Sequence, residues 1–218
     1  LKDGSQKEYA ESKSVYEIAL DISEGLARAA CAGEVDGEVV DLRTVVEKDC
    51  EVSILTANDE KGLAALRHTA SHVLAEAVKN LYPEAKLAIG PSIDTGFYYD
   101  FDHESFSREE LDALEKEMKK IIKKGAKIER YTLPREEAIK FMEEKGEPYK
   151  VELIKDLPEG EEISFYSQGD FVDLCAGPHL MNTKGVKAFK LTSIAGAYWR
   201  GSEKNKMLTR IYGTAFSN

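Results

Sequence analysis

The sequence predicts an α+β protein of two units, a small one over residues 1–57 and a larger one after it. Short alternating apolar runs, typical of strands, occur together with apolar runs at three- and four-residue spacing, typical of helices. The composition is that of an ordinary globular protein, with 42% hydrophobic and 32% charged residues. A chain of 218 residues is long enough for one large domain or two smaller ones.

The first unit contains one helix among several short strands. Ser14 and Glu17 have the spacing of a capping box, which predicts the start of a helix. Asp36-Gly37 between apolar runs indicates a tight hairpin, and Glu51–Thr56 alternates like a closing strand. This pattern predicts a ubiquitin-like β-grasp. The unit shows no cluster of catalytic residue types, which favours a recognition or docking role.

The second unit begins with a long helix. Asn58 is a suitable N-cap, so a helix over roughly 59–81 is expected before Tyr82-Pro83. A capping box at Ser107–Glu110 starts another helix, which stops at Gly125. Pro134 starts a helix that ends near residue 146, and EPYKVELI is expected to be extended. The segments AIGPSIDTGFYYDFD, KIERYTL, ISFYS, DFVDLC and VKAFKLTSI predict turns and strands of a mostly antiparallel sheet flanked by helices.

The distribution of charge leaves two interpretations open. The net charge of −10 argues weakly against nonspecific nucleic-acid binding. Two stretches are nonetheless basic, Lys119–Lys127 and Lys184–Arg210, and the second holds seven Lys or Arg residues against Glu203 alone. These stretches are either solvated surface or a face that contacts a polyanion.

Three cysteines do not form a disulfide framework, so a reducing, cytoplasmic location is expected. No run of about 18 apolar residues and no leader pattern occurs, which predicts neither a membrane span nor a signal peptide. The chain starts with Leu and is expected to be a piece of a longer protein.

Two histidines lie four residues apart in LRHTASHVLAEAV. His68 and His72 fall about 140–180° around the helix from Leu63, which excludes them from the core and places them toward water or a cleft. The pair suits a metal or a shared substrate, but the Glu of a metalloprotease motif is replaced by Thr69. The apolar stripe of this helix is formed by Leu63, Leu66, Ala70, Val73, Leu74, Ala77 and Leu81.

The loop DLCAGPHL offers partners for that pair. Cys175 and His179 also lie four apart, with Asp173 two residues before the cysteine. Together with the two helical histidines they form a set of zinc ligands, or a metal-free hydrolytic site in which His moves a proton and Asp orients it. Cys175 as a covalent nucleophile is a further alternative. A buried structural cysteine and a turn histidine would explain the loop without any chemistry.

At this point the chain resembles the N-terminal half of a bacterial-type threonyl-tRNA synthetase. The resemblance covers essentially the whole chain through HTASH, AIGPSIDTGFYYDFD, EPYK, FVDLCAGPH and GAYWRGSEKNKMLTRIYGTAF, in the family's order and spacing. It implies a TGS (ubiquitin-like) domain over 1–57 and an editing (second additional) domain over 58–203. It further implies that 204–218 start a linker to the absent catalytic core. Leu180-Met181-Asn182 depart from the family, which often has proline at the second position.

The resemblance implies post-transfer editing, the hydrolysis of the ester of mischarged Ser-tRNA(Thr). Serine is smaller than threonine by one methyl, and excluding a smaller competitor by binding contributes only about 1–3 kcal/mol. A second, tighter site destroys the error instead. By the same resemblance, the residues that line this site are His68, His72, Lys150, Cys175 and His179, with Lys150 and His68 positioning or activating water.

Three further residues take substrate-binding roles by the same resemblance. Asp173 is expected to bind the seryl amino group, and Tyr99 and Gly90 to shape the site around serine and the terminal adenosine. Tyr99 alternates with Phe97 and Phe101, so periodicity alone places it in the core. Without the resemblance, Lys150 would be taken as a surface lysine.

The resemblance also sets expectations for cofactors and partners. No metal is expected to be obligatory for editing, with Zn²⁺ as the alternative; ATP, Mg²⁺ and Zn²⁺ belong to the missing core. The partner is tRNA(Thr), whose 3′-terminal adenosine carries serine, with no membrane, and the full-length enzyme is expected to be a homodimer through that core. The competing functions are a zinc-dependent deacylase of the alanyl-editing type and a tRNA-binding module without catalysis.

Overall fold

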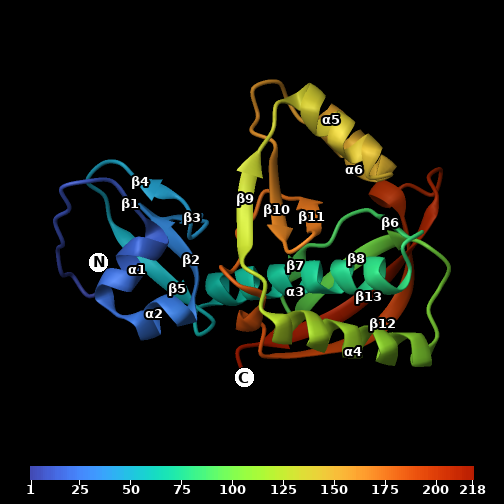
Figure 1. The fold of residues 1–218 in the computed structure, drawn as a ribbon, viewed down its shortest axis with the longest axis horizontal. Coiled ribbons are helices and arrows are strands. Elements are labelled where there is room, and N and C mark those ends of the chain that lie inside the picture. Colours follow the sequence, from blue (N-terminus) through green and yellow to red (C-terminus); the bar gives the residue numbers. More distant parts are fainter.

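A computed structural model describes residues 1–218, and Figure 1 shows a small blue unit beside a larger one. The capping box of Ser14 and Glu17 is present, and Asp36 and Gly37 have positive φ in the turn between two paired strands, as predicted. The elements of this unit are β1 (Lys13–Ser14), α1 (Val15–Ile22), α2 (Glu24–Ala29), β2 (Ala30–Val35), β3 (Glu38–Val40), β4 (Val45–Val46) and β5 (Val52–Thr56).

The small unit has its own core and shares a second one with the larger unit. Its strands pair in the order β3-β2-β5, and β1 pairs with β4. Val15, Ile18 and Leu42 are buried in its own core. Cys31 and Leu55 instead belong to the large core that contains the long helix of the second unit. The two units are therefore joined by continuous apolar packing.

The second unit consists of helices and antiparallel strands, which confirms the α+β class. Its helical elements are α3 (Glu60–Leu81), α4 (Arg108–Lys124), α5 (Arg135–Glu144), α6 (Pro148–Asp156) and the 3₁₀ turns η1 (Thr183–Gly185) and η2 (Trp199–Gly201). Its strands are β6 (Lys86–Leu87), β7 (Ser92–Ile93), β8 (Gly96–Asp102), β9 (Ile128–Thr132), β10 (Ser164–Gln168), β11 (Phe171–Leu174), β12 (Ala188–Tyr198) and β13 (Met207–Phe216).

Two sheets frame the long helix α3. The larger has the order β12-β13-β8-β6 with β7 on β8, and the smaller has the order β11-β10-β9. α3 packs on β8 and β13 and contacts α4, and Figure 1 shows α3 and α4 crossing the lower part of this unit together. No helix combines the length and apolar content needed to cross a membrane. All three cysteines are free thiols.

The expectation of an extended EPYKVELI is wrong, because this segment forms α6. Tyr149, Val151 and Leu153 alternate and imitate a strand. The buried side chains are instead Lys150 and Ile154, four residues apart on one helical face. Pro148 stands at the start of the helix, where its missing N–H has no cost.

The expectation that residues 204–218 begin a linker is also wrong, because most of them form β13. This strand lies between β12 and β8 in the larger sheet. Its side chains alternate between buried and partly exposed, with Leu208, Ile211 and Ala215 in the cores. A smaller correction concerns α3, whose N-cap is Asp59 rather than Asn58.

The hairpin between β12 and β13 holds α6 in place. Trp199, at the tip, is only 6% exposed and packs edge-on against Tyr149 at 5.0 Å between ring centroids. Its Nε1 donates to Glu152 at 3.0 Å. Arg200 next to it forms ion pairs with Glu152 and Asp156. The position of α6 therefore depends on contacts with a hairpin that is distant in sequence.

We expect Trp199→Ala to lower the free energy of unfolding by about 3 kcal/mol, because it removes a buried ring and leaves the partner side chains unpacked. Tyr198→Ala is the matched control, since the adjacent Tyr198 is 40% exposed. It should cost less than about 1 kcal/mol. Urea unfolding monitored by circular dichroism measures both, and equal losses would contradict the role of this contact.

Candidate functional site

Four nitrogen and sulfur donors from two separate segments meet at one place. His68 and His72 come from the middle of α3, and Cys175 and His179 come from the loop after β11. Their ligand atoms all lie within 4.8 Å of one another. Cys175 Sγ lies 3.2 Å from His68 Nε2 and 3.2 Å from His179 Nε2. The loop therefore places the Cys175 thiol between the imidazoles of His68 and His179, which are more than 100 residues apart in the sequence.

The helical phase places the histidines off the apolar stripe of α3, but they do not face open water. His72 and His179 are 3% and 1% exposed. The strand β11 and its following loop cover this side of α3, so Phe171 packs edge-on against His72 at 6.5 Å. His68 and Cys175 are partly exposed and form the outer edge of the cluster.

A second group surrounds the Asp173 carboxylate, which is 2% exposed. Its Oδ2 accepts a hydrogen bond from the Tyr99 hydroxyl at 2.6 Å and lies 3.4 Å from His72 Nε2. The Lys150 ammonium lies 2.9 Å from Oδ1, but this oxygen has no well-directed hydrogen bond. Oδ1 therefore keeps acceptor capacity for a cationic group.

The structure places Lys150 and Tyr99 in this group for different reasons. Lys150 is buried because it lies on the inner face of α6. Without the resemblance, this lysine would be expected at the surface. Tyr99 is fully buried and stacks on Phe101 at 4.9 Å, as its periodicity indicates. Only its hydroxyl reaches Asp173. Tyr99 thus belongs both to the core and to the polar group.

Gly90 lies behind Tyr99. A Cβ atom on Gly90 would overlap the Tyr99 ring. The Ser71 hydroxyl holds this segment on α3, because it lies 2.8 Å from the Gly90 carbonyl oxygen and 2.6 Å from that of His68. Gly90 therefore sets the position of Tyr99 through close packing, while its own carbonyl is held by Ser71.

Burial keeps the imidazoles neutral at physiological pH. Burial lowers the pKa of His68 to about 3 and that of His72 to about 4, against the opposing effect of the Asp173 charge. Burial also holds the pKa of His179 well below its usual value. The His72–Asp173 contact, 3.4 Å between Nε2 and Oδ2, is therefore a polar contact with a neutral ring rather than an ion pair.

Asp173 and Cys175 are in opposite protonation states. Burial opposes ionisation of Asp173, but Lys150 and His72 outweigh it and lower the net pKa of this carboxyl. Burial and the neighbouring Asp173 raise the pKa of the Cys175 thiol to about 12, against the opposing Gly177 N–H. A protonated thiol is a poor nucleophile, which argues against the covalent role for Cys175.

Thr69 is a site residue that sequence reasoning missed. Its Oγ1 lies 3.0 Å from His179 Nδ1 and accepts from the Leu180 N–H at 3.0 Å. The hydroxyl proton is then free to point at Nδ1, which would leave the ring proton of His179 on Nε2, toward Cys175. The sequence signal for Thr69 is its position between the two histidines of HTASH. By itself this position indicates only that the Glu of a metalloprotease motif is absent.

The four donors also fit a zinc ion. Cys and His are its preferred ligands, and a tetrahedral site would place neighbouring donors about 3.3–3.6 Å apart. The two sulfur–nitrogen separations of 3.2 Å are close to that spacing. The same two separations are also those of hydrogen bonds, and the four donors as a set lie within 4.8 Å of one another, so the ligand types suit zinc while the positions are those of a hydrogen-bonded cluster.

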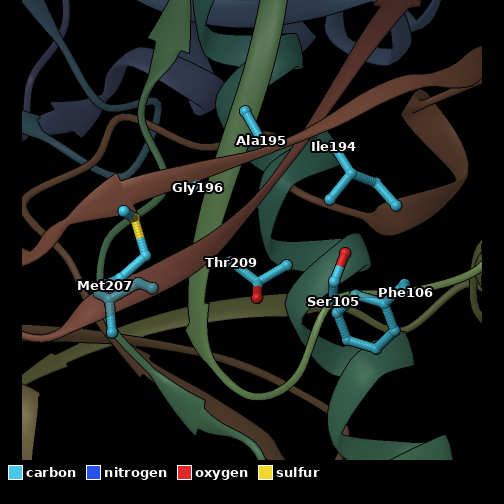
Figure 2. Close-up of a pocket in the computed structure, with 8 residues that line it drawn as sticks. Ser105, Phe106, Ile194, Ala195, Gly196, Met207 and Thr209 are labelled. Carbon is cyan, nitrogen blue, oxygen red and sulfur yellow. The ribbon is translucent and has the colours of Figure 1, made fainter.

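A hollow of about 510 Å³ lies elsewhere, between β12, β13 and the segment before α4 (Figure 2). Figure 2 shows the Phe106 ring and the Ser105 and Thr209 hydroxyls among its lining side chains. None of the residues that line it is titratable, so it lacks groups for proton transfer. The chemistry-bearing side chains are instead those of the His/Cys cluster and the Asp173 group.

Two family models match parts of the chain. Residues 1–56 match the TGS domain, which agrees with the predicted β-grasp, and residues 163–212 match the threonyl and alanyl tRNA synthetase second additional domain. The second match contains Asp173, Cys175 and His179.

Curated relatives match along the whole chain. A threonine--tRNA ligase of Acetivibrio thermocellus is 68% identical over all 218 residues, and one of Clostridium botulinum (strain Kyoto) is 62% identical over the same length. One of Caldanaerobacter subterraneus is 60% identical over 99% of the chain. The chain spans 34% of the length of each of these relatives. The chain therefore contains a TGS domain and a second additional domain, and along its whole length it is similar to the N-terminal part of threonine--tRNA ligases.

Proposed function

We propose that this chain edits mischarged tRNA by hydrolysing the ester of Ser-tRNA(Thr). The observation that supports this most is the pairing of a buried, ionised Asp173 with a neutral His/Cys cluster in the second additional domain. The carboxylate suits the ammonium group of an aminoacyl ester, and the cluster lies on the solvent side of it. In the reaction, a water oxygen bonds to the ester carbonyl carbon, the bond to the ribose oxygen breaks, and a water proton passes to that oxygen.

Asp173 would bind the seryl amino group through Oδ1, and the Tyr99 hydroxyl would keep Oδ2 in place. Lys150 is the cation nearest to Asp173, so we assign it to the developing negative charge on the carbonyl oxygen. His68 is neutral and partly exposed, which suits the orientation of water. Cys175 and His179 would hold His68 through the sulfur contacts.

Discrimination against threonine would depend on close packing. The Tyr99 ring cannot move away from the proposed serine pocket, because Gly90 and Phe101 lie against it. A pocket with such rigid walls excludes an added methyl more effectively than a pocket that can relax. Serine would fit and be hydrolysed, whereas threonine would be rejected before its carbonyl reached the water.

No step requires a metal in this proposal. A zinc ion on His68, His72, Cys175 and His179 would supply Lewis-acid activation of water, and the residues would bind and orient the ester in the same way. The longer protein of which this chain would be a part is proposed to ligate threonine to tRNA(Thr) with ATP, Mg²⁺ and Zn²⁺ and to assemble as a homodimer. The basic stretch Lys184–Arg210 is proposed to contact the tRNA.

The substrate assignment is tested by deacylation of purified Ser-tRNA(Thr) and Thr-tRNA(Thr). We expect Ser-tRNA(Thr) to be hydrolysed roughly 10–200-fold faster, the range that one methyl group supports in a specificity pocket. Equal hydrolysis of both, or of neither, would contradict the proposal. Tight tRNA binding without turnover would support the binding-module alternative.

Lys150→Met should lower kcat/KM for Ser-tRNA(Thr) about 100-fold, because it removes the cation beside Asp173 while keeping an unbranched side chain. Lys155→Met on the exposed face of the same helix is the control and should leave the rate within about twofold. Circular dichroism checks that both variants fold. Equal rates for the two variants would exclude Lys150 from the reaction.

Dialysis against a strong chelator should leave the deacylation rate unchanged, because the hydrogen-bonded cluster orients water without an ion. Metal content before and after dialysis is measured by mass spectrometry on the same samples. Loss of activity that added Zn²⁺ restores would instead favour the zinc-dependent alternative.

A further inference from the structure

The segment from Asp41 to Arg43 of the TGS domain reaches the loop that carries His179. Between them, Leu42 is fully buried in the core of the TGS domain and anchors the segment there. The backbone N–H and the Nη1 of Arg43 each donate to Asp41 Oδ1 at 2.8 Å. Asp41 and Arg43 are therefore fixed relative to each other and to their own domain.

The second oxygen of Asp41 binds the editing domain directly. Oδ2 accepts the His179 backbone N–H at 3.1 Å and the Tyr166 hydroxyl at 2.7 Å. The Tyr166 ring lies 4.5 Å from the His179 ring, centroid to centroid. A Cβ on Gly177 would overlap the Tyr166 hydroxyl, so the loop runs closely over this ring. Asp41 thus fixes both the loop and the surface beneath it.

Arg43 binds backbone carbonyl groups of the same loop. Its Nη1 donates to the His179 carbonyl at 3.2 Å, and its Nη2 donates to the Leu180 carbonyl at 2.7 Å and the Ile128 carbonyl at 2.6 Å. Met181, where the family often has proline, packs against the TGS core. The main chain of His179 is therefore held at its N–H and its C=O by residues of the other domain.

These contacts bear on the cluster because the His179 ring has little freedom of its own. Its two nitrogens meet Thr69 at 3.0 Å and Cys175 at 3.2 Å. Hydrogen bonds that involve a charged partner are stronger and more directional than neutral ones. A shift of the His179 backbone would therefore move the ring and, through Cys175, the His68 contact.

We propose that Asp41 and Arg43 are positioning residues of the hydrolytic site, so that the TGS domain completes the editing pocket from outside. The inference rests on the proposed function, because it takes the His179 cluster as the site of hydrolysis. It assigns a structural task to a domain whose sequence shows no catalytic residues. The two residues act through the His179 backbone and touch no substrate.

Asp41→Asn tests this with nearly unchanged shape. The carboxylate accepts hydrogen bonds on both oxygens, whereas the Asn amide nitrogen cannot accept, so one pair of contacts is lost in either orientation of the amide. We expect kcat for Ser-tRNA(Thr) to fall about tenfold with KM within about twofold, because misplaced groups slow the chemical step. Arg43→Lys, which keeps the charge but loses the bidentate contacts, should have the same effect.

Arg28→Ala is the matched control within the TGS domain. Arg28 lies on α2, is exposed, and contacts only Glu24 at 3.9 Å. This variant should keep the wild-type kcat and KM. The four histidines give a second readout that does not depend on turnover, because their ring ¹³C signals can be assigned with single His→Gln variants. In Asp41→Asn the His179 signal should shift, whereas that of His103, which contacts Glu84 and Glu104, should not.

The outcomes separate this inference from the proposed function. A wild-type kcat together with an unshifted His179 signal in both Asp41→Asn and Arg43→Lys would overturn the inference. So would a loss of activity that Arg28→Ala reproduces. If the wild-type protein leaves Ser-tRNA(Thr) intact, the proposed function fails, and the His179 signal alone decides whether the TGS domain positions the loop.

Discussion

The burial of one carboxylate organises this part of the molecule. An ionised Asp173 inside a protein is tolerated only when cations and hydrogen-bond donors surround it, and removing one partner of such a buried pair typically costs about 3–5 kcal/mol. The groups around it come from three different elements, namely the Lys150 ammonium from α6, the Tyr99 hydroxyl from β8 and the His72 ring from α3, while β11 carries the carboxylate itself. The energetic requirement of one charge therefore fixes the relative positions of two helices and two sheets.

The same burial divides the site into a charged part and a neutral part. Lys150 and Asp173 carry opposite charges, while the imidazoles and the Cys175 thiol stay uncharged at neutral pH. The neutral His68 and His179 rings are oriented by contacts with the Cys175 sulfur, which gives them defined donor and acceptor directions. An aminoacyl ester has the same division, with a charged ammonium and a neutral carbonyl, and this correspondence connects the geometry with the proposed chemistry.

Much of the fold could be predicted from local sequence signals. The capping boxes at Ser14 and Ser107 and the stop at Gly125 were correct because each is set by a few adjacent residues. α6 was missed because its amphipathic face contains a lysine, whose burial depends on the distant Asp173. β13 was missed because one of its two neighbours in the sheet, β8, lies about 100 residues earlier in the sequence.

The site could be predicted from the sequence only in part, for the same reason. Residue types and spacing singled out the two segments that carry the His/Cys cluster, and the resemblance to a known family added Lys150, Tyr99 and Gly90. Asp41 and Arg43 gave no such signal, and Thr69 lay inside HTASH without a role of its own, because their partners are mostly backbone groups, with one ring nitrogen and the Tyr166 hydroxyl. Contacts to the main chain leave almost no trace in the sequence of either partner.

The central position of β13 has a consequence for the order in which the protein is made. Thr209 pairs with Phe101, so β8 emerges from the ribosome about 100 residues before the strand beside it. At about 5–20 residues per second, this interval lasts roughly 5–20 s. During that time β8, with its row of aromatic side chains, lacks its neighbour β13. Strand pairing over such a sequence distance is also slow in itself. The wall of the site that contains Tyr99 is therefore among the last parts of the protein to become rigid during synthesis.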